Sequence, residues 1–278
     1  MKKVAIVTGG NKGLGFGICR GLAQVFDGDV LLTARNTERG MQAVQDLEKE
    51  GLTVKFHLLD IDDSESIAAL ATFVKETYGG IDVLVNNAGI KSRIEPFGLQ
   101  AQVTIATNYF SVQNCCSQLF PLLRNGSRVV NVGSSSGVLE RIEDQDLKSK
   151  FASSGSTLKY KELDTLMRDF IEAANAGDHV AKGWPDHTYA VSKIGLSALT
   201  RIQQQKLTEN PDLKDVVINH VHPGYLNTDL TRHKGTMTID EGAKSSIFAA
   251  TLPPNTDIKG QYIWSDCQIV DWVHGPIP

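Results

Sequence analysis

The sequence contains little cysteine, and its cysteines form no pattern that usually binds zinc or builds a disulfide framework. Only four of the 278 residues are cysteines, and none of them forms a Cys-x-x-Cys pair: Cys19, Cys115, Cys116 and Cys267. Small secreted domains and zinc modules have denser or regularly spaced cysteines. We therefore expect reduced thiols, and a cytoplasmic protein.

Long apolar runs and a strong excess of one charge are also missing. No stretch approaches the roughly 20 apolar residues that cross a bilayer, and the apolar run after Met1 is too short for a signal peptide. The net charge of −4 gives no reason to expect a nucleic acid or an anionic membrane as partner. With 41% hydrophobic and 22% charged residues and no repeat, we expect one globular domain over residues 1–278.

Short apolar runs alternate with helix-length segments along the whole chain. Most runs are nearly continuous in Val, Ile and Leu, as expected for strands covered on both faces. We expect strands at Val4–Val7, Val30–Leu32, Val54–Leu59, Val83–Val85, Val129–Val132, Val216–Val221 and, more weakly, Gln261–Trp264. Helical patterns lie between them, for example at Gly15–Phe26, Thr37–Glu50 and Ser64–Tyr78. The alternation predicts an α/β fold, a doubly wound parallel sheet of about seven strands with helices on both faces.

One segment, residues 138–188, interrupts this alternation. It contains no strand pattern, but apolar residues follow helical spacing from Leu163 through Met167 and Phe170 to Ala174. We interpret it as a helical insertion, and a surface loop is the alternative because its flanks are polar.

A glycine-rich loop follows the first expected strand and leads into a helix. Glycines permit a tight turn and bring backbone N–H groups close to a pyrophosphate, which a helix N-terminus also favours. A simple strand-to-helix turn is the alternative, but the position in the first β-α unit is the one that dinucleotide sites require. The residues expected to bind the cofactor here are Thr8, Gly9, Asn11, Lys12, Gly13, Leu14 and Gly15.

The end of the second strand indicates which nucleotide binds. An NAD site usually has Asp or Glu there to accept from the ribose 2′-hydroxyl, but this strand ends in Ala34-Arg35. Arg35 is suited to a 2′-phosphate, and Lys12 and Arg39 add positive charge to the same corner. Each cation alone is more often a solvated surface residue. Together, where an acid is missing, they favour NADP(H) as the cofactor.

Polar and small residues also follow the third, fourth and sixth strands. Asp60 with Ile61 is placed to contact the adenine, and small residues after the fourth strand allow the cofactor close approach. Backbone groups after the sixth strand are placed to hold the nicotinamide carboxamide. Caps and turns are the alternative for each of these residues. The remaining expected cofactor contacts are Asn87, Ala88, Gly89, Pro223, Gly224, Leu226, Asn227 and Thr228.

Tyr189 and Lys193 begin a helical pattern that runs to about Gln205. Their i to i+4 spacing puts the phenol and the ammonium on one helix face. A nearby cation stabilises phenolate and makes the phenol a better proton donor near neutral pH. Tyr-x-x-x-Lys also arises by chance, so the pair needs support from other residues.

Two further residues supply that support. Ser134, after the fifth strand, is placed to hydrogen-bond a substrate carbonyl oxygen as that oxygen gains charge. Asn108 is polar among core-like residues, and its amide could bridge Lys193 to a proton-relay water or satisfy a backbone group. A serine-rich turn is the alternative for Ser134.

In this order, these motifs resemble the short-chain dehydrogenase/reductase family over nearly the whole chain. Within it, the stretches Val7-Thr-Gly-Gly-Asn-Lys-Gly13, Leu59-Asp-Ile-Asp-Asp63 and Gly79-Gly-Ile-Asp-Val-Leu-Val-Asn-Asn-Ala-Gly89 look most like the monomeric NADPH-dependent carbonyl reductases. The resemblance implies a Rossmann fold with the helical insertion before the catalytic Tyr189. It also implies a monomer, because the insertion covers a face that other members use to tetramerise.

The resemblance implies roles as well. Tyr189 would be the general acid and also a cofactor contact. Ser134 would be the donor that orients the carbonyl, Lys193 the cation that binds the cofactor ribose, and Asn108 the support of a water relay. Ser134, Tyr189 and Tyr225 would contact the substrate, a small ketone, aldehyde or quinone. The alternatives are an NAD(P)-dependent alcohol or steroid dehydrogenase working mainly in the oxidative direction, and a non-catalytic NADPH-sensing protein.

The sequence departs from those relatives in two places. His222 stands where they have Cys before Pro-Gly, and the segment Lys91–Leu99 is shorter, which leaves their binding of glutathione adducts open here. His220 and His222 would share one face of a strand, a spacing compatible with a metal. No third ligand is apparent, so we expect no metal site.

Overall fold

The computed structural model describes residues 2–275 and 277–278. Within these residues, eight strands form one sheet in the order β3-β2-β1-β4-β5-β6-β7-β8. Neighbouring strands are parallel except β7 and β8, which are antiparallel. The strands are β1 (Val4–Val7), β2 (Asp29–Ala34), β3 (Lys55–Leu58), β4 (Ile81–Asn86), β5 (Leu123–Val132), β6 (Val217–Val221), β7 (Tyr262–Ile263) and β8 (Ile269–Val270).

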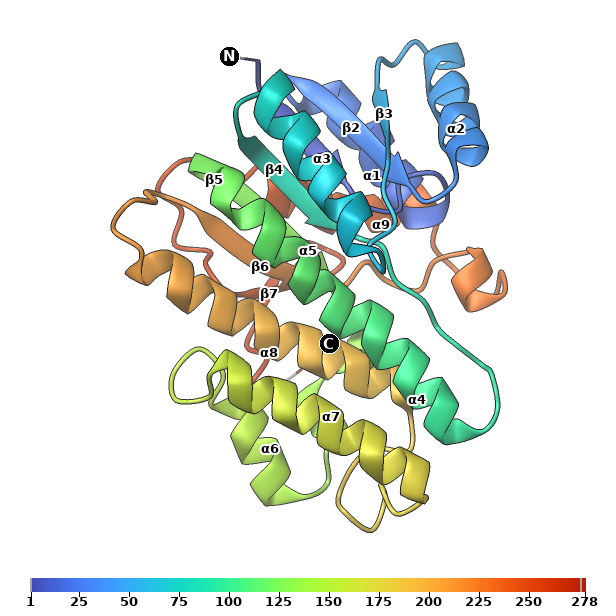
Figure 1. The fold of residues 1–278 in the computed structure, drawn as a ribbon, viewed down its shortest axis with the longest axis vertical. Coiled ribbons are helices and arrows are strands. Elements are labelled where there is room, and N and C mark those ends of the chain that lie inside the picture. The colour runs from blue at the N-terminus through green and yellow to red at the C-terminus, as the bar shows by residue number, and fades with distance from the viewer. Residues whose placement is uncertain (1, 276) are drawn as a thin grey trace.

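Helices cover both faces of this sheet, and Figure 1 looks onto the face that carries α5 and α8. The α-helices are α1 (Gly13–Val25), α2 (Thr37–Lys49), α3 (Ser64–Thr77), α4 (Phe97–Ile105), α5 (Val112–Leu119), α6 (Gln145–Ala152), α7 (Tyr160–Ala176), α8 (Thr188–Glu209) and α9 (Ile239–Ala250). A π-helical segment, η1 (Ala106–Ser111), joins α4 to α5. Short 3-10 turns occur at η2 (Phe120–Leu122), η3 (Ser135–Gly137), η4 (Leu139–Arg141) and η5 (Asp229–Thr231).

The predicted doubly wound sheet is confirmed, with one strand more than expected. The hydrophobic core consists of two layers, one beneath α1, α2 and α9 and the other beneath α3, α4, α5, α7 and α8. All residues of β1, β2 and β6 are buried, which explains their lack of polar alternation. Strand β8 was missed because its two residues show no periodicity and become a strand only by pairing with β7.

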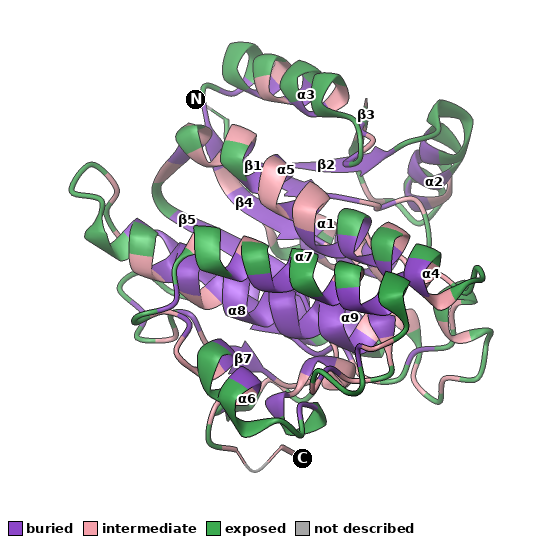
Figure 2. Cartoon of the chain, turned by 60° about the horizontal axis from the view of Figure 1, so that its bottom comes forward, coloured by how far each residue is buried: buried purple, intermediate pink, exposed green. Residues whose placement is uncertain are grey.

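The insertion before Tyr189 is helical, as predicted, and consists mainly of α6 and α7. The apolar side of α7 includes Leu163, Met167 and Phe170 and is buried. This helix packs against α4 and α8, and Figure 2 shows α8 almost wholly buried beneath it. The helix that carries Tyr189 and Lys193 is thus held between the sheet and the insertion, so both side chains have a rigid support. No helix in residues 2–275 and 277–278 has the length and apolar character needed to cross a membrane.

Candidate active site

The carboxyl ends of β1 to β6 surround one cavity of about 640 Å³. In a doubly wound sheet, ligands bind at this edge, next to the point where the strand order reverses. That point lies between β1 and β4, which are neighbours in the sheet although two strands separate them in the sequence. The cavity extends from Arg35, after β2, to Ser134 and Tyr189 at its other end.

The glycine-rich loop between β1 and α1 forms one wall of the cavity. Gly9 and Gly13 have φ of +64° and +55°, a left-handed conformation that favours glycine. A Cβ on Gly15 would lie 2.3 Å from the carbonyl oxygen of Gly9, so a side chain there would displace the loop. Lys12, the N-cap of α1, makes no side-chain capping hydrogen bond, so the first N–H groups of that helix are free of a side-chain partner. This helix end fits a pyrophosphate.

Thr8 and Asn87 tie this loop to the end of β4. The Thr8 hydroxyl accepts hydrogen bonds from the N–H groups of Asn87 (3.0 Å) and Ala88 (2.9 Å). The Asn87 amide in turn donates to the carbonyl oxygens of Thr8 (2.8 Å) and Gly9 (3.1 Å). Thr8 is buried and does not line the cavity, whereas Asn87, Ala88 and Gly89 do. Thr8 therefore holds the cavity wall in place from behind.

Several residues predicted to bind the cofactor lie together at the end of the cavity that follows β2 and β3. Arg35, Asp60 and Ile61 line it, and Arg35 is exposed. Arg39 lies in a smaller adjoining hollow, which Lys12 also lines. Asp60 Oδ1 accepts a hydrogen bond from the N–H of Asp62 at 3.1 Å, so part of its carboxylate serves the local turn.

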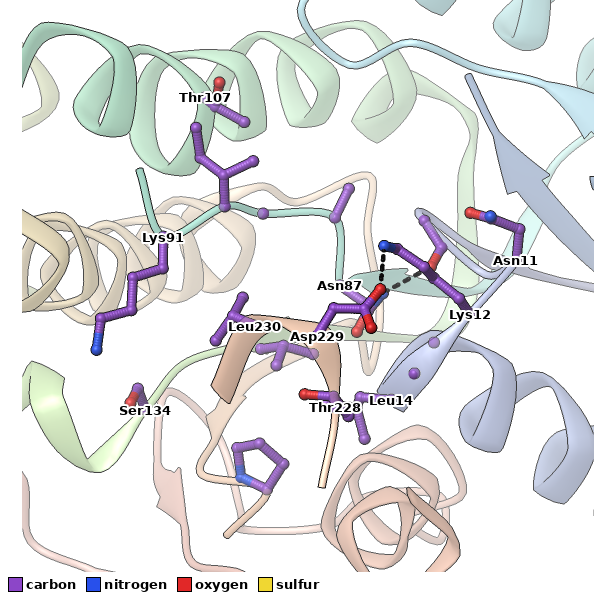
Figure 3. A pocket seen from close by; sticks show the side chains of 18 of the residues that line it. Asn11, Lys12, Leu14, Asn87, Lys91, Thr107, Ser134, Thr228, Asp229 and Leu230 are labelled. Carbon is purple, nitrogen blue, oxygen red and sulfur yellow. Dashed lines mark hydrogen bonds and ion pairs between the residues drawn. The ribbon is translucent and has the colours of Figure 1, made fainter. Parts of the chain in front are cut away.

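Lys12 is paired across the cavity with a residue that the sequence analysis did not single out. Its Nζ lies 2.6 Å from Oδ2 of Asp229, which also lines the cavity (Figure 3). Both side chains are exposed, and the lysine keeps the pKa of the Asp229 carboxyl below its usual range. Nothing in the local sequence around Asp229 indicates this contact.

Ser134, Tyr189 and Lys193 meet at the opposite end of the cavity. Lys193 is buried, its Nζ donates to the carbonyl oxygen of Val132 at 2.7 Å, and it lies 5.6 Å from the centroid of the Tyr189 ring. Burial raises the pKa of Tyr189 to about 12, while the Ser134 side chain acts in the opposite direction. Burial lowers the pKa of Lys193 to about 8. The site thus combines a protonated phenol with a cation beside it at neutral pH.

Asn108 lies in the π-helical segment η1, and its side-chain amide hydrogen-bonds to the backbone of Ile90. Its Oδ1 accepts from the N–H of Ile90 at 2.8 Å, and its Nδ2 donates to the Ile90 carbonyl oxygen at 2.8 Å and to Ser192 Oγ at 3.0 Å. The hydrogen bonds to a backbone group that were considered for this amide are present, and its part in a proton-relay water stays a prediction. Gly89 lies next to both Asn108 and Lys193, since a Cβ there would lie 3.1 Å from Asn108 Oδ1 and 3.8 Å from Lys193 Nζ.

His222 connects two loops near the end of the cavity where Ser134 and Tyr189 lie. Its Nδ1 accepts hydrogen bonds from the N–H groups of Ser135 (3.1 Å) and Gly224 (3.4 Å), and burial lowers its pKa to about 4. His220 is fully buried and stacks on Tyr262, with ring centroids 4.5 Å apart. The two imidazoles thus have separate structural surroundings within β6 and the loop after it.

The loop after β6 contributes only part of the predicted set. Pro223, Gly224, Asn227 and Thr228 line the cavity. Leu226 is buried and Tyr225 is half-exposed, and neither lines it. The cavity is also lined by residues that the sequence analysis did not single out one by one, among them Asp62, Lys91, Thr107, Leu230, His233 and Ile239.

The chain is similar to known proteins over nearly its whole length. A family model described as short chain dehydrogenase matches residues 3–154. Carbonyl reductase (NADPH) 3 of Mus musculus is 45% identical over 94% of this chain and 95% of its own, and carbonyl reductase (NADPH) 1 of Homo sapiens is 43% identical over 97% and 98%. The structure of salutaridine reductase from Papaver somniferum covers 96% of this chain and all of its own with a TM-score of 0.85 and 28% identity.

Proposed function

Because the chain belongs to the short-chain dehydrogenase family, we propose that it is an NADPH-dependent reductase of ketones, aldehydes or quinones. The observation that carries the proposal is the meeting of Ser134, Tyr189 and Lys193 at one end of the cavity whose other end is lined by the glycine-rich loop and Arg35. The relatives named carbonyl reductase (NADPH), which match over nearly their full length, support the same activity.

The residues along the cavity fit NADPH. The free N–H groups at the start of α1 would hold the pyrophosphate. Arg35, with Lys12 close by, would bind the 2′-phosphate at the end of β2, where no acid stands. Gly89 would allow close approach of the nicotinamide half, and the backbone of Pro223–Thr228 would hold the carboxamide. The bound cofactor supplies the hydride that reduces the carbonyl carbon.

The protein groups then act on the oxygen of the substrate. Ser134 donates a hydrogen bond to the carbonyl oxygen, and Tyr189 transfers its phenolic proton as that oxygen becomes an alkoxide. The pKa of about 12 keeps Tyr189 protonated at neutral pH, as a general acid must be. The Lys193 ammonium stabilises the phenolate that remains. Asn108 is a positioning residue: its two hydrogen bonds fix the Ile90 backbone beside the cavity.

The compact insertion supports a monomeric assembly. Helix α7 packs over α4 and α8 and so covers this side of the catalytic helix with the chain's own residues. All four cysteines are free thiols, which suits the cytoplasm. Analytical ultracentrifugation should therefore give the mass of one chain, and a concentration-dependent tetramer would contradict the assignment.

Replacing Tyr189 by Phe tests the proposal. NADPH consumption with a panel of quinones, aromatic ketones and aldehydes should proceed with the wild type. Tyr189→Phe should lower kcat by about 10³-fold, because a positioned general acid contributes 10²–10⁴-fold. NADPH binding, followed by its fluorescence, should remain nearly intact.

Tyr160→Phe is the matched control, because it removes a phenol oxygen that does not line the cavity. It should leave kcat unchanged. A Tyr189→Phe variant that keeps more than about a tenth of the wild-type kcat would overturn the assignment, since loss of a general acid costs more than this.

A further inference from the structure

Lys91 brings a second ammonium group to the reaction end of the cavity. It lines the cavity directly after Gly89 and Ile90, and its Nζ lies 5.5 Å from the centroid of the Tyr189 ring. Lys193 lies almost equally close to that ring, at 5.6 Å. Figure 3 shows Lys91 near Ser134, at the end of the view opposite to Asn11 and Lys12. The proposed reaction mechanism uses Lys193 but gives Lys91 no role.

Lys91 has no anionic partner within residues 2–275 and 277–278. Among the residues that the structure describes, no acidic side chain forms an ion pair with it. Burial lowers its pKa, and the charges of Arg93 and Arg141 lower it further. An ammonium that is half-buried among like charges is destabilised, and an anion bound beside it relieves that cost.

The two arginines whose charges act on Lys91 come from separate segments of the chain. Arg93 lies two residues after Lys91 and donates to the carbonyl oxygen of Leu230 at 3.0 Å. Arg141 ends the turn η4 at the start of the insertion and forms no ion pair within the described part of the chain. His187, the N-cap of α8, has a pKa lowered by burial and then by Lys91 and Arg141. Its neighbour Asp186 is instead paired with His179 at 3.0 Å.

We propose that the substrate carries an anionic group, most simply a carboxylate, which the Lys91 ammonium binds while the carbonyl oxygen lies against Ser134 and Tyr189. Arg141 and Arg93 add to the positive potential around that anion. The inference rests on the proposed reductase function and names the class of its substrate: a carbonyl compound with a carboxylate elsewhere in the molecule. A neutral carbonyl compound of the same shape leaves the ammonium unpaired and binds less tightly.

Paired probes test this class. The activity of the wild type and of Lys91→Gln is measured with NADPH against 4-formylbenzoate and against neutral 4-formylbenzamide. The ratio of their kcat/KM values is compared between the enzymes, so the intrinsic reactivity of the two aldehydes cancels. We expect the preference for the acid to fall about 10-fold in Lys91→Gln, mainly through KM, because a charge-assisted hydrogen bond to the substrate is lost.

Two further variants show whether the effect of Lys91→Gln comes from the lost charge or from a change in the protein structure. Lys91→Arg keeps the charge and should retain most of the preference. Lys75→Gln removes an exposed lysine of α3 that does not line the cavity, and should keep the wild-type ratio. Added salt should weaken the preference in the wild type more than in Lys91→Gln.

The outcomes are distinguishable. If Lys91→Gln keeps the wild-type ratio while both enzymes reduce the neutral aldehyde, the inference fails and the proposed reductase function stands. If the variant raises KM for NADPH as strongly as KM for the acid, Lys91 serves the cofactor and the inference is overturned. If the wild type reduces neither probe nor any member of the carbonyl panel, the proposed function fails, and the inference with it.

Discussion

The two ends of the cavity both carry positive charge, but they carry it in different surroundings. At the nucleotide end, the side chains of Arg35 and Lys12 are exposed, and Lys12 is paired with an exposed carboxylate. At the reaction end, Lys193 is buried and Lys91 is half-buried, and burial lowers the pKa of both. One end thus presents charge to water and the other holds charge away from it.

This difference has a physical consequence for function. A charge in water is screened, so exposed cations contribute moderately to binding and do so in a salt-dependent way. A charge held away from water interacts more strongly with its neighbours, and its protonation depends on pH near neutrality. We therefore expect changes at the reaction end to affect kcat strongly, and changes at the nucleotide end to affect cofactor affinity.

Removing the buried charge at the reaction end should have the largest effect. Lys193→Met replaces the ammonium by an apolar group of similar length, so phenolate at Tyr189 loses its stabilising cation. We expect kcat/KM to fall by about 10³-fold, within the range observed for loss of acid–base support. Steady-state kinetics with NADPH and a reactive aldehyde would measure this, and a loss below tenfold would contradict the role of Lys193.

The pH dependence of wild-type activity tests the same role of the Lys193 charge. Lys193 must be charged to act, and its pKa is lowered from 10.5 to about 8. The value of kcat/KM, which reports the free enzyme, should be constant below that pKa and fall as the pH rises through about 8. A profile that stays flat up to the ordinary lysine value of 10.5 would show that the charge of Lys193 is not required.

Removing an exposed charge at the nucleotide end should have a smaller effect, confined to binding. Arg35→Ala should raise KM for NADPH by about 10- to 100-fold, since hydrogen bonds to charged groups contribute about 1.5–3 kcal/mol. KM for NADH and kcat should change little, because NADH lacks the 2′-phosphate. Added salt should raise KM for NADPH in the wild type and reduce the difference between the two enzymes.

Arg39→Ala is the matched control, because Arg39 lies in the adjoining hollow rather than in the main cavity. It should raise KM for NADPH less than Arg35→Ala does. An unchanged preference for NADPH over NADH in Arg35→Ala would place the 2′-phosphate elsewhere.

The smallest effect is expected for the exposed ion pair between Lys12 and Asp229. Asp229→Asn removes the partner that occupies Lys12, so the ammonium becomes available to a phosphate. KM for NADPH should fall by no more than about threefold, because exposed ion pairs are weak. KM for NADPH is measured in both variants: it should fall in Asp229→Asn, which frees Lys12, and rise in Lys12→Gln, which removes the cation. A tenfold rise in Asp229→Asn would mean that the carboxylate itself holds the cofactor.

Site residues could be predicted where a pattern of neighbouring residues in the sequence marked them, and not where contacts between distant residues decided. The glycine-rich loop, Ser134 and the Tyr189/Lys193 pair were predicted because each combines a residue type with a position at a strand end or a helix spacing, and the structure brings them to one cavity. Asn108 was noted as an unusual polar residue, but its hydrogen bonds to Ile90 could not be predicted without coordinates. Tyr225 was expected at the substrate, and it does not line the cavity.

The sequence by itself determined the order of β and α segments, the glycine-rich loop and the spacing of Tyr189 and Lys193, because apolar periodicity, glycine chemistry and helix geometry act between near neighbours. Only the tertiary structure decided which cations are paired and which are free. Lys12 meets Asp229, 217 residues further along the chain, whereas Lys91 and Arg141 come together from separate loops without an acid. Such contacts depend on how distant loops pack at the edge of the sheet, and no local pattern encodes them.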